Sequence, residues 1–171
     1  MKKLITYRGI IYPWQCDHMG HMNVMWYTGK FDEASWVLLA HLGLTPSRLK
    51  EAHRGMAAVQ QNITYQKELR AGDVVTIRTK IIEIREKVLR FVHEMVKEPT
   101  GETAAITELT GVHMDTRRRK SIELPSDILT NAREVMLHQN EGVEDEEAFH
   151  ETLPGIGTRD NWGTQVSASI G

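Results

Sequence analysis

The sequence contains a single cysteine in 171 residues, so no disulfide can form within the chain, and we expect a reducing compartment, the cytoplasm. No apolar run approaches the roughly 18 residues of a membrane-spanning helix, and no membrane partner is expected. We expect no signal peptide, because Met1-Lys2-Lys3 is followed by only a few apolar residues before Arg8. A net charge of −2 gives no reason to expect nucleic acid as the principal partner.

One long helical pattern is present. It should begin at Asn23, a preferred N-cap residue, and end at Gly43, which suits the position just beyond a helix. The residues between them predict about twenty helical residues, on the order of 30 Å long. Their spacing of three and four places the following side chains on one buried stripe: Val24, Tyr27, Phe31, Ala34 or Ser35, Leu38 and Leu42.

Five segments have the alternation or the β-branched and aromatic content of strands: Leu4 to Trp14, Met56 to Glu68, Val74 to Ile84, Val88 to Lys97 and Thr103 to Met114. Thr45 to Gly55 reads as a polar link. In the second strand, alternation predicts one face formed by Ala57, Val59, Gln61, Ile63 and Tyr65. Since short turns separate the last four strands, we expect them to form an antiparallel meander.

These elements predict an α+β fold, because the helix has no helical partner before residue 125 and must bury its stripe on the sheet. A long, curved antiparallel sheet wrapped around one central helix meets that requirement over residues 1–125. Residues 126–171 should hold a short helix, Asp127 to His138 after Ser126, and an extended or weakly ordered acidic tail from about residue 140. Exposed strand edges predict at least a dimer.

Asp17 is the leading candidate for chemistry. It lies in a loop just before the helix N-terminus, where free N–H groups and the helix dipole favour negative charge. A carbonyl oxygen held by the N–H of Val24 would be polarised, and a carboxylate opposite it would attack the carbonyl or activate water. The simpler alternative is that Asp17 only stabilises its turn.

Three other kinds of site are conceivable from the sequence. His18 and His21 with Asp17 fall short of the ligands that zinc needs, so no metal is expected. Cys16 as a nucleophile is disfavoured by the adjacent Asp17 carboxylate, which opposes a thiolate. The basic run Arg117 to Lys120 is more simply a solvated strand end, or a binder of one phosphorylated ligand, than a nucleic-acid patch.

The residues Cys16-Asp17-His18-Met19-Gly20-His21-Met22-Asn23, followed by Tyr27, Phe31, Asp32, Glu33 and Ala34, resemble the signature of hot-dog-fold acyl-CoA thioesterases of the 4-hydroxybenzoyl-CoA thioesterase type. Leu69 to Asp73 and His113-Met114-Asp115 are also similar to that family. The resemblance covers about residues 5 to 125. It implies a hot-dog fold in a homodimer or homotetramer, with the site at a subunit interface.

The resemblance also implies roles for residues of the loop. Asp17 matches the catalytic carboxylate, as nucleophile or general base, and the backbone N–H of Val24 matches the group that holds the thioester oxygen. Gly20 matches the glycine of the tight turn. His18 and His21 would orient Asp17 or water, or only hydrogen-bond the loop.

The implied substrate is an acyl-CoA of small or medium size, and no separate cofactor is expected because coenzyme A is part of the substrate. Substrate-binding candidates are the cap Asn23, the aromatic residues Trp14, Trp26 and Tyr27, and the basic residues Arg70 and Arg90, with Lys87 and Arg117 to Arg119 as further candidates for the phosphates. Aromatic side chains facing the acyl group would favour a cationic or aromatic acyl chain; otherwise they simply pack in the core. The alternative function is a non-catalytic hot-dog module that binds acyl-CoA or a related ligand.

Overall fold

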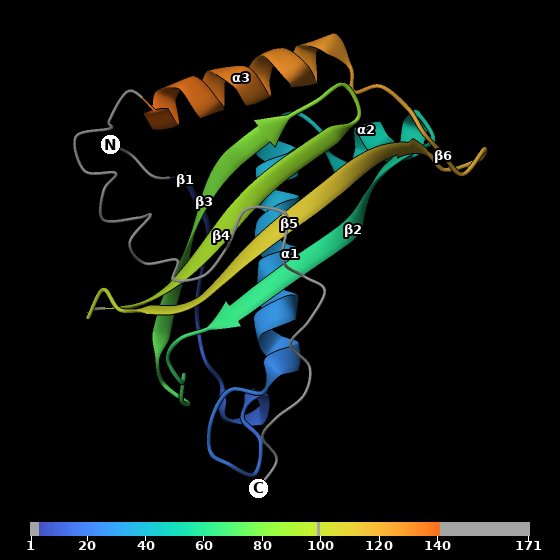
Figure 1. The fold of residues 1–171 in the computed structure, drawn as a ribbon. Helices are drawn as coiled ribbons and strands as arrows, with labels where there is room; N and C mark the ends of the chain where they lie inside the picture. The colour runs from blue at the N-terminus through green and yellow to red at the C-terminus, as the bar shows by residue number, and fades with distance from the viewer. Residues whose placement is uncertain (1–3, 99, 141–171) are drawn as a thin grey trace, which may run out of the picture. The chain divides into compact units, whose positions relative to one another are not determined.

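The computed structural model describes residues 4–98 and 100–140, shown in Figure 1. In chain order the elements are β1 (Leu4–Ile10), the short 3-10 helix η1 (Pro13–Gln15), α1 (Val24–His41), α2 (Pro46–Glu51), β2 (Arg54–Tyr65), β3 (Val74–Ile84), β4 (Val88–Glu98), β5 (Thr103–Asp115), β6 (Lys120–Ser121) and α3 (Ser126–Asn140). The predicted acidic tail lies outside the described residues, and the domain boundary at residue 125 stays a prediction.

The sheet is antiparallel, with strand order β1-β3-β4-β5-β2 and β6 paired with β5. The predicted meander is therefore right for β3 to β5 and wrong for β2, which pairs with β5 from Arg54↔Asp115 to Tyr65↔Ala105. The position beside β3 is already taken by β1. Residues 66–73 form a crossover segment that returns the chain to β3, with the side chain of Leu69 fully buried.

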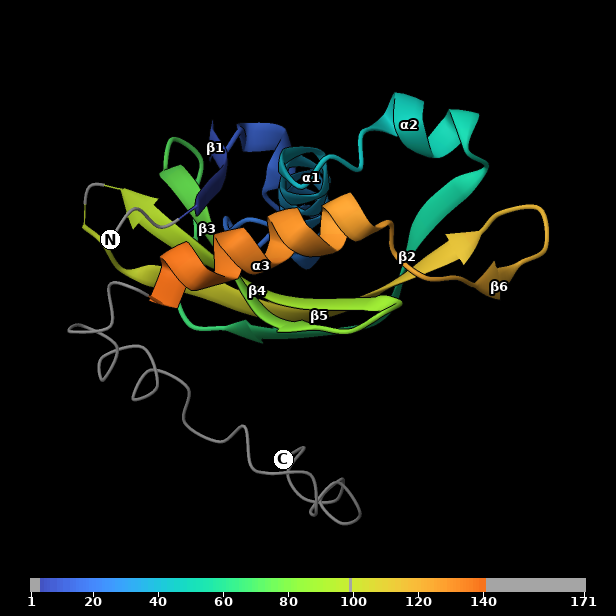
Figure 2. The same cartoon turned by 90° about the horizontal axis from the view of Figure 1, so that it is seen from above.

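Helix α1 lies along the concave side of the curved sheet, seen nearly end-on in Figure 2. Its N-terminal half packs in one core cluster with residues such as Leu69, Ile77 and Met95, and its C-terminal half packs in a second cluster that includes α3. This arrangement confirms the predicted curved sheet around a central helix. Val24, however, is 58% exposed, so its place on the buried stripe was wrong: the buried face of α1 starts only at Tyr27.

Two predicted boundaries were also wrong. The first strand ends at Ile10 rather than continuing to Trp14, because Pro13 has no N–H for a ladder and the chain turns into η1. The side-chain oxygen of Gln15 accepts the N–H of Tyr12 at 3.0 Å and holds that turn. The polar link after α1 contains α2, which is capped by Thr45: its Oγ1 accepts the N–H of Arg48 at 3.3 Å.

A β-bulge between Ala58 and Gln60 changes the expected faces of β2. Ala57 pairs with Val112, whereas Gln61 pairs with the core residue Leu109, three positions earlier on β5. Because side chains alternate along a strand, Ala57 lies on the opposite face from Gln61, and the single face predicted for Ala57 to Tyr65 was wrong.

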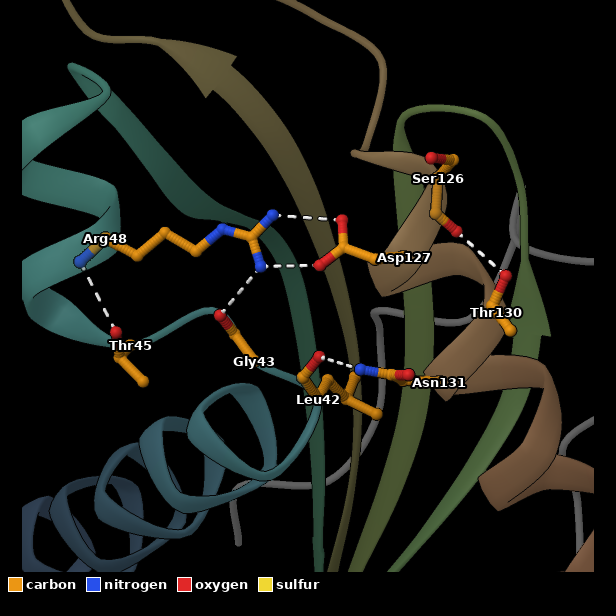
Figure 3. Close-up of polar contacts among 8 residues, drawn as sticks. All are labelled: Leu42, Gly43, Thr45, Arg48, Ser126, Asp127, Thr130 and Asn131. Carbon is orange, nitrogen blue, oxygen red and sulfur yellow. Dashed lines mark hydrogen bonds and ion pairs between the residues drawn. The ribbon is translucent and has the colours of Figure 1, made fainter.

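Helix α3 crosses the C-terminal end of α1, and Figure 3 shows the polar contacts that hold it there. Arg48 donates two hydrogen bonds to the Asp127 carboxylate at 2.7 and 2.9 Å, and a further bond to the carbonyl of Gly43 at 3.4 Å. Asn131 Nδ2 donates to the Leu42 carbonyl at 2.9 Å. Carbonyl groups left open at the end of α1 are thus satisfied by α2 and α3.

A buried hydrogen-bond chain ties the middle of α1 to the sheet. Ser35 uses its one hydroxyl proton on the Phe31 carbonyl at 2.8 Å, so it accepts from His93 Nε2 at 3.0 Å. His93 Nδ1 must then accept from the Thr79 hydroxyl at 2.6 Å. Burial lowers the pKa of His93 to about 3, so the ring is neutral with its proton on Nε2.

A second buried contact joins α1 to β1. Lys30 is only 4% exposed, and its Nζ donates to the hydroxyl of Tyr7 at 2.8 Å. The Tyr7 ring lies over Gly9, where a Cβ would come within 2.3 Å of the hydroxyl oxygen. Gly9 is therefore required for the position of Tyr7 and, through it, for the Lys30 hydrogen bond.

Candidate active site

The loop before α1 closes on itself around Asp17. The Asp17 N–H donates to the His21 carbonyl at 3.0 Å, and the Gly20 N–H donates to the Asp17 carbonyl at 2.9 Å. Gly20 has φ of +79°, a conformation that favours glycine. The next residue but one, Met22, is buried, and its N–H donates to the Leu69 carbonyl at 2.7 Å, which anchors the loop to the crossover segment.

Hydrogen bonds orient both oxygens of the Asp17 carboxylate. Oδ1 accepts the N–H of Met19 at 2.9 Å, and Oδ2 accepts Nδ2 of Asn23 at 3.3 Å. Asn23 in turn caps α1, as predicted, with its Oδ1 accepting the N–H of Met25 at 3.1 Å. Asp17 therefore stabilises its turn, and through Asn23 it is also held beside the start of the helix.

In the first turn of α1, one backbone N–H has no hydrogen-bond acceptor among the described residues. The N–H groups of Met25 and Trp26 are taken by the side chain and the carbonyl of Asn23. For the N–H of Val24 no acceptor is found among the described residues, and its side chain is exposed. An oxygen atom that gains negative charge would be stabilised at this position by the N–H and by the helix dipole.

The two histidines of the loop have different surroundings. His21 Nε2 lies 2.9 Å from Oε2 of Glu68 on the crossover segment, and Arg70 lies 3.9 Å from the same oxygen. His18 is exposed and makes no hydrogen bond with the described residues. Across residues 4–98 and 100–140, no three His, Cys, Asp or Glu side chains gather as a metal site would require. Cys16 is partly buried and packs against the core cluster that contains Leu69, Ile77 and Met95.

Two pairs of aromatic side chains come from segments next to the loop. Trp14 is 67% exposed and stacks on Tyr12, with ring centroids 4.3 Å apart. Tyr27 meets Tyr65 of β2 edge-on at 5.1 Å and donates its hydroxyl to the Lys67 carbonyl at 3.3 Å. Burial raises the pKa of Tyr27 to about 12, so it stays a hydrogen-bond donor at neutral pH. Trp26 is half-buried and packs against the same core cluster.

The basic candidates are separated by the fold. Arg70 is exposed on the crossover segment, next to the loop. Arg90 points away from α1, because its neighbours Leu89 and Phe91 point into the core. There it bonds Glu83 at 2.6 Å and also Glu108, and these contacts raise its pKa. The basic turn Arg117 to Lys120 follows the C-terminal end of β5. The crossover segment instead contacts the N-terminal end of β5, at Ala104, so the basic turn lies at the opposite end of this strand.

The structure thus brings together Asp17, Gly20, His21, Asn23 and Val24, with Arg70 nearby, and places Arg90 on the other face. It adds two residues that sequence reasoning missed, Glu68 and Tyr65. Both were read as parts of a strand of the meander, and no local signal places them beside the loop. Their positions depend on the pairing of β2 with β5 and on the crossover that follows.

Comparisons with known proteins give consistent findings. Residues 11–132 match the model of a family described as the thioesterase-like superfamily. An L-carnitine dehydrogenase/betainyl-CoA thioesterase of Agrobacterium fabrum is 30% identical over 126 residues, which make up 74% of this chain and 25% of that protein. A betainyl-CoA thioesterase of Pseudomonas aeruginosa is 23% identical over 126 residues, covering 74% of this chain and 79% of that protein.

Among solved structures, a Staphylococcus aureus protein in complex with CoA has a TM-score of 0.75 at 20% identity, covering 99% of this chain and 98% of that one. At this identity the likeness shows the fold. This chain spans about a quarter of the length of the Agrobacterium relative. Within the part of the chain that is described, no helix is long and apolar enough to cross a membrane.

Proposed function

The chain belongs to the thioesterase-like superfamily, with the hot-dog fold, and on that basis we propose that it is an acyl-CoA thioesterase that releases a small or medium acid and CoA. The observation that carries the proposal is the placement of Asp17. Asn23 bonds the Asp17 carboxylate with one end of its amide and caps α1 with the other, one residue before the open N–H of Val24.

The chemistry needs few groups. A thioester carbonyl is electrophilic and its thiolate leaves readily, so a carboxylate and an oxyanion donor are sufficient. Asp17 attacks the carbonyl carbon or activates water, while the Val24 N–H stabilises the negative charge on the thioester oxygen. Gly20 supplies the turn that brings the carboxylate back toward the helix start.

For the acyl group we propose a cation such as the betainyl group named for two relatives. The exposed, stacked Tyr12–Trp14 pair and the Tyr27–Tyr65 pair near the loop offer aromatic faces and edges. Quaternary ammonium groups bind aromatic faces through cation–π attraction, with about 0.5–2 kcal/mol per contact. A neutral acyl group of equal shape loses this term.

For the CoA phosphates, Arg70 is the favoured cation, because it is exposed beside the loop. Arg90 fits a structural role better, since two carboxylates already hold it on the other face.

We propose that a second copy of the chain completes the site, in a homodimer or homotetramer. β2 is an edge strand, and most of its side chains are exposed, including some on the face of the sheet that α1 covers. Gln61 and Tyr65 are exposed there, which is unusual for the inner face of a sheet. Light scattering of the purified chain tests this, and a monomer at assay concentrations would contradict it.

The function is tested by thiol release from betainyl-CoA and from tert-butylacetyl-CoA, its neutral isostere. We expect hydrolysis of the cationic ester at least tenfold faster in kcat/KM, and a loss of about 100-fold or more in Asp17→Asn, which removes the base but keeps the size. Asp127→Asn, at the other end of α1, is the matched control. Full activity in Asp17→Asn would overturn its role, and binding without cleavage of any ester would favour the non-catalytic module.

A further inference from the structure

The contact between His21 and Glu68 is not explained by the roles described so far. Glu68 belongs to the crossover segment, and its Oε2 lies 2.9 Å from Nε2 of His21 in the loop of Asp17. We propose that Glu68 is a positioning residue, which holds His21 as the base that activates water in the second half of thioester hydrolysis. This inference rests on the proposed function.

The contact joins two segments that the backbone already fixes to each other. The N–H of Met22, the residue after His21, donates to the carbonyl of Leu69, the residue after Glu68, at 2.7 Å. Leu69 is fully buried and Met22 nearly so. A side-chain pair carried on such a frame loses less conformational freedom than a pair of mobile surface chains.

The partner determines which ring nitrogen is available. The carboxylate of Glu68, 2.9 Å from Nε2 of His21, favours a proton on that nitrogen. In the neutral ring Nδ1 then has a free lone pair, and it makes no hydrogen bond within the described residues. The His21 backbone is itself one hydrogen bond from Asp17. A carboxylate that fixes the tautomer and orientation of a histidine is a recurrent arrangement for a general base.

The proposal assigns separate steps to the two groups. First, an Asp17 oxygen bonds to the thioester carbon, the C–S bond breaks, and its electron pair leaves with the CoA thiolate. Water then attacks the resulting anhydride and gives one proton to His21 Nδ1. The bond between the acyl carbon and Asp17 breaks, its electron pair returns to the carboxylate, and the imidazolium releases its proton to solvent.

The competing explanation is a surface contact that only holds the loop in place. The side chains are 24% and 63% exposed, so as a simple ion pair the contact would stabilise the fold only weakly. Such a contact would affect folding but would not favour one chemical step over another. The two explanations therefore differ in kinetics.

The test measures steady-state and pre-steady-state CoA release from betainyl-CoA. In Glu68→Ala we expect kcat to fall about 10-fold and in His21→Gln about 100-fold, with kcat/KM within about twofold of wild type, because acylation is untouched. Both variants should show a burst approaching one CoA per site. Glu68→Gln, which keeps an acceptor for Nε2 without the charge, should fall between wild type and Glu68→Ala.

A double variant separates positioning from direct action. Because Glu68 acts through His21, adding Glu68→Ala to His21→Gln should change kcat no further. Glu102→Gln is the matched control. Glu102 forms a similarly exposed ion pair with Lys67 of the crossover segment, with 3.8 Å between Oε1 and Nζ. Removing this carboxylate should leave kcat unchanged.

The outcomes are distinguishable from failure of the proposed function. If wild type cleaves no thioester, the proposed function itself fails. If wild type cleaves and Asp17→Asn does not, but Glu68→Ala keeps its kcat or loses kcat and kcat/KM equally without a burst, the positioning role is overturned while the thioesterase remains.

Discussion

The buried histidine between α1 and the sheet predicts how stability depends on pH. His93 is fully buried, bonded to Ser35 and Thr79, and flanked by the rings of Phe31 and Phe91. Burial lowers its pKa from 6.5 to about 3. Between these two values the unfolded chain binds a proton that the folded chain does not. The stabilisation is therefore complete above about pH 6.5 and is lost as the pH falls toward 3.

The size of the effect follows from the shift. Each pH unit below 6.5 costs about 1.4 kcal/mol, so lowering the pH from 7 to 5 should remove about 2 kcal/mol of unfolding free energy through His93 alone. Burial also lowers the pKa of His113, which acts in the same direction. The carboxylates with lowered pKa, such as Asp115 and Glu98, mainly contribute at lower pH.

A variant isolates the His93 contribution. His93→Gln keeps a polar side chain but does not titrate, and it retains the contribution of His113. Urea unfolding at pH 7, 6 and 5, at constant ionic strength and protein concentration, gives the free energy for both chains. We expect wild type to lose about 2 kcal/mol more than His93→Gln between pH 7 and 5. Parallel losses in the two chains would refute the reasoning.

Two further predictions concern stability. Gly9→Ala should cost about 1–2 kcal/mol in urea unfolding, because the new Cβ displaces the Tyr7 hydroxyl from its part-buried hydrogen bond with Lys30. Gly29→Ala, in an open position of α1, should instead stabilise by up to about 1 kcal/mol, and equal effects of the two substitutions would contradict this. Asp127→Asn should cost at most about 1 kcal/mol, because its pair with Arg48 is about half exposed. Arg48 lowers the pKa of Asp127, so this contribution should vanish as the pH falls through that lowered pKa, and a cost that persists in acid would argue against it.

Local sequence patterns predicted most of the helices and strands, because helix caps and turns depend on residues that are neighbours along the chain. Asn23 caps α1 through its own side chain, and Gly43 has the positive φ expected of a residue just past a helix. The pairing of strands within the sheet was harder to predict from the sequence. A short-range argument joined β2 to β3, whereas β1, from the far end of the domain, occupies that position.

The candidate site divides in the same way. Sequence patterns alone predicted the loop of Asp17, the turn at Gly20 and the helix start near Val24, because these lie within one short segment whose hydrogen bonds are local. The folded chain was needed to show that Glu68 meets His21 and that Arg90 faces away from α1. Those positions follow from the strand order, the β-bulge and the crossover segment. These three features depend on which apolar surfaces, far apart in the sequence, are buried together, and local sequence patterns do not predict that.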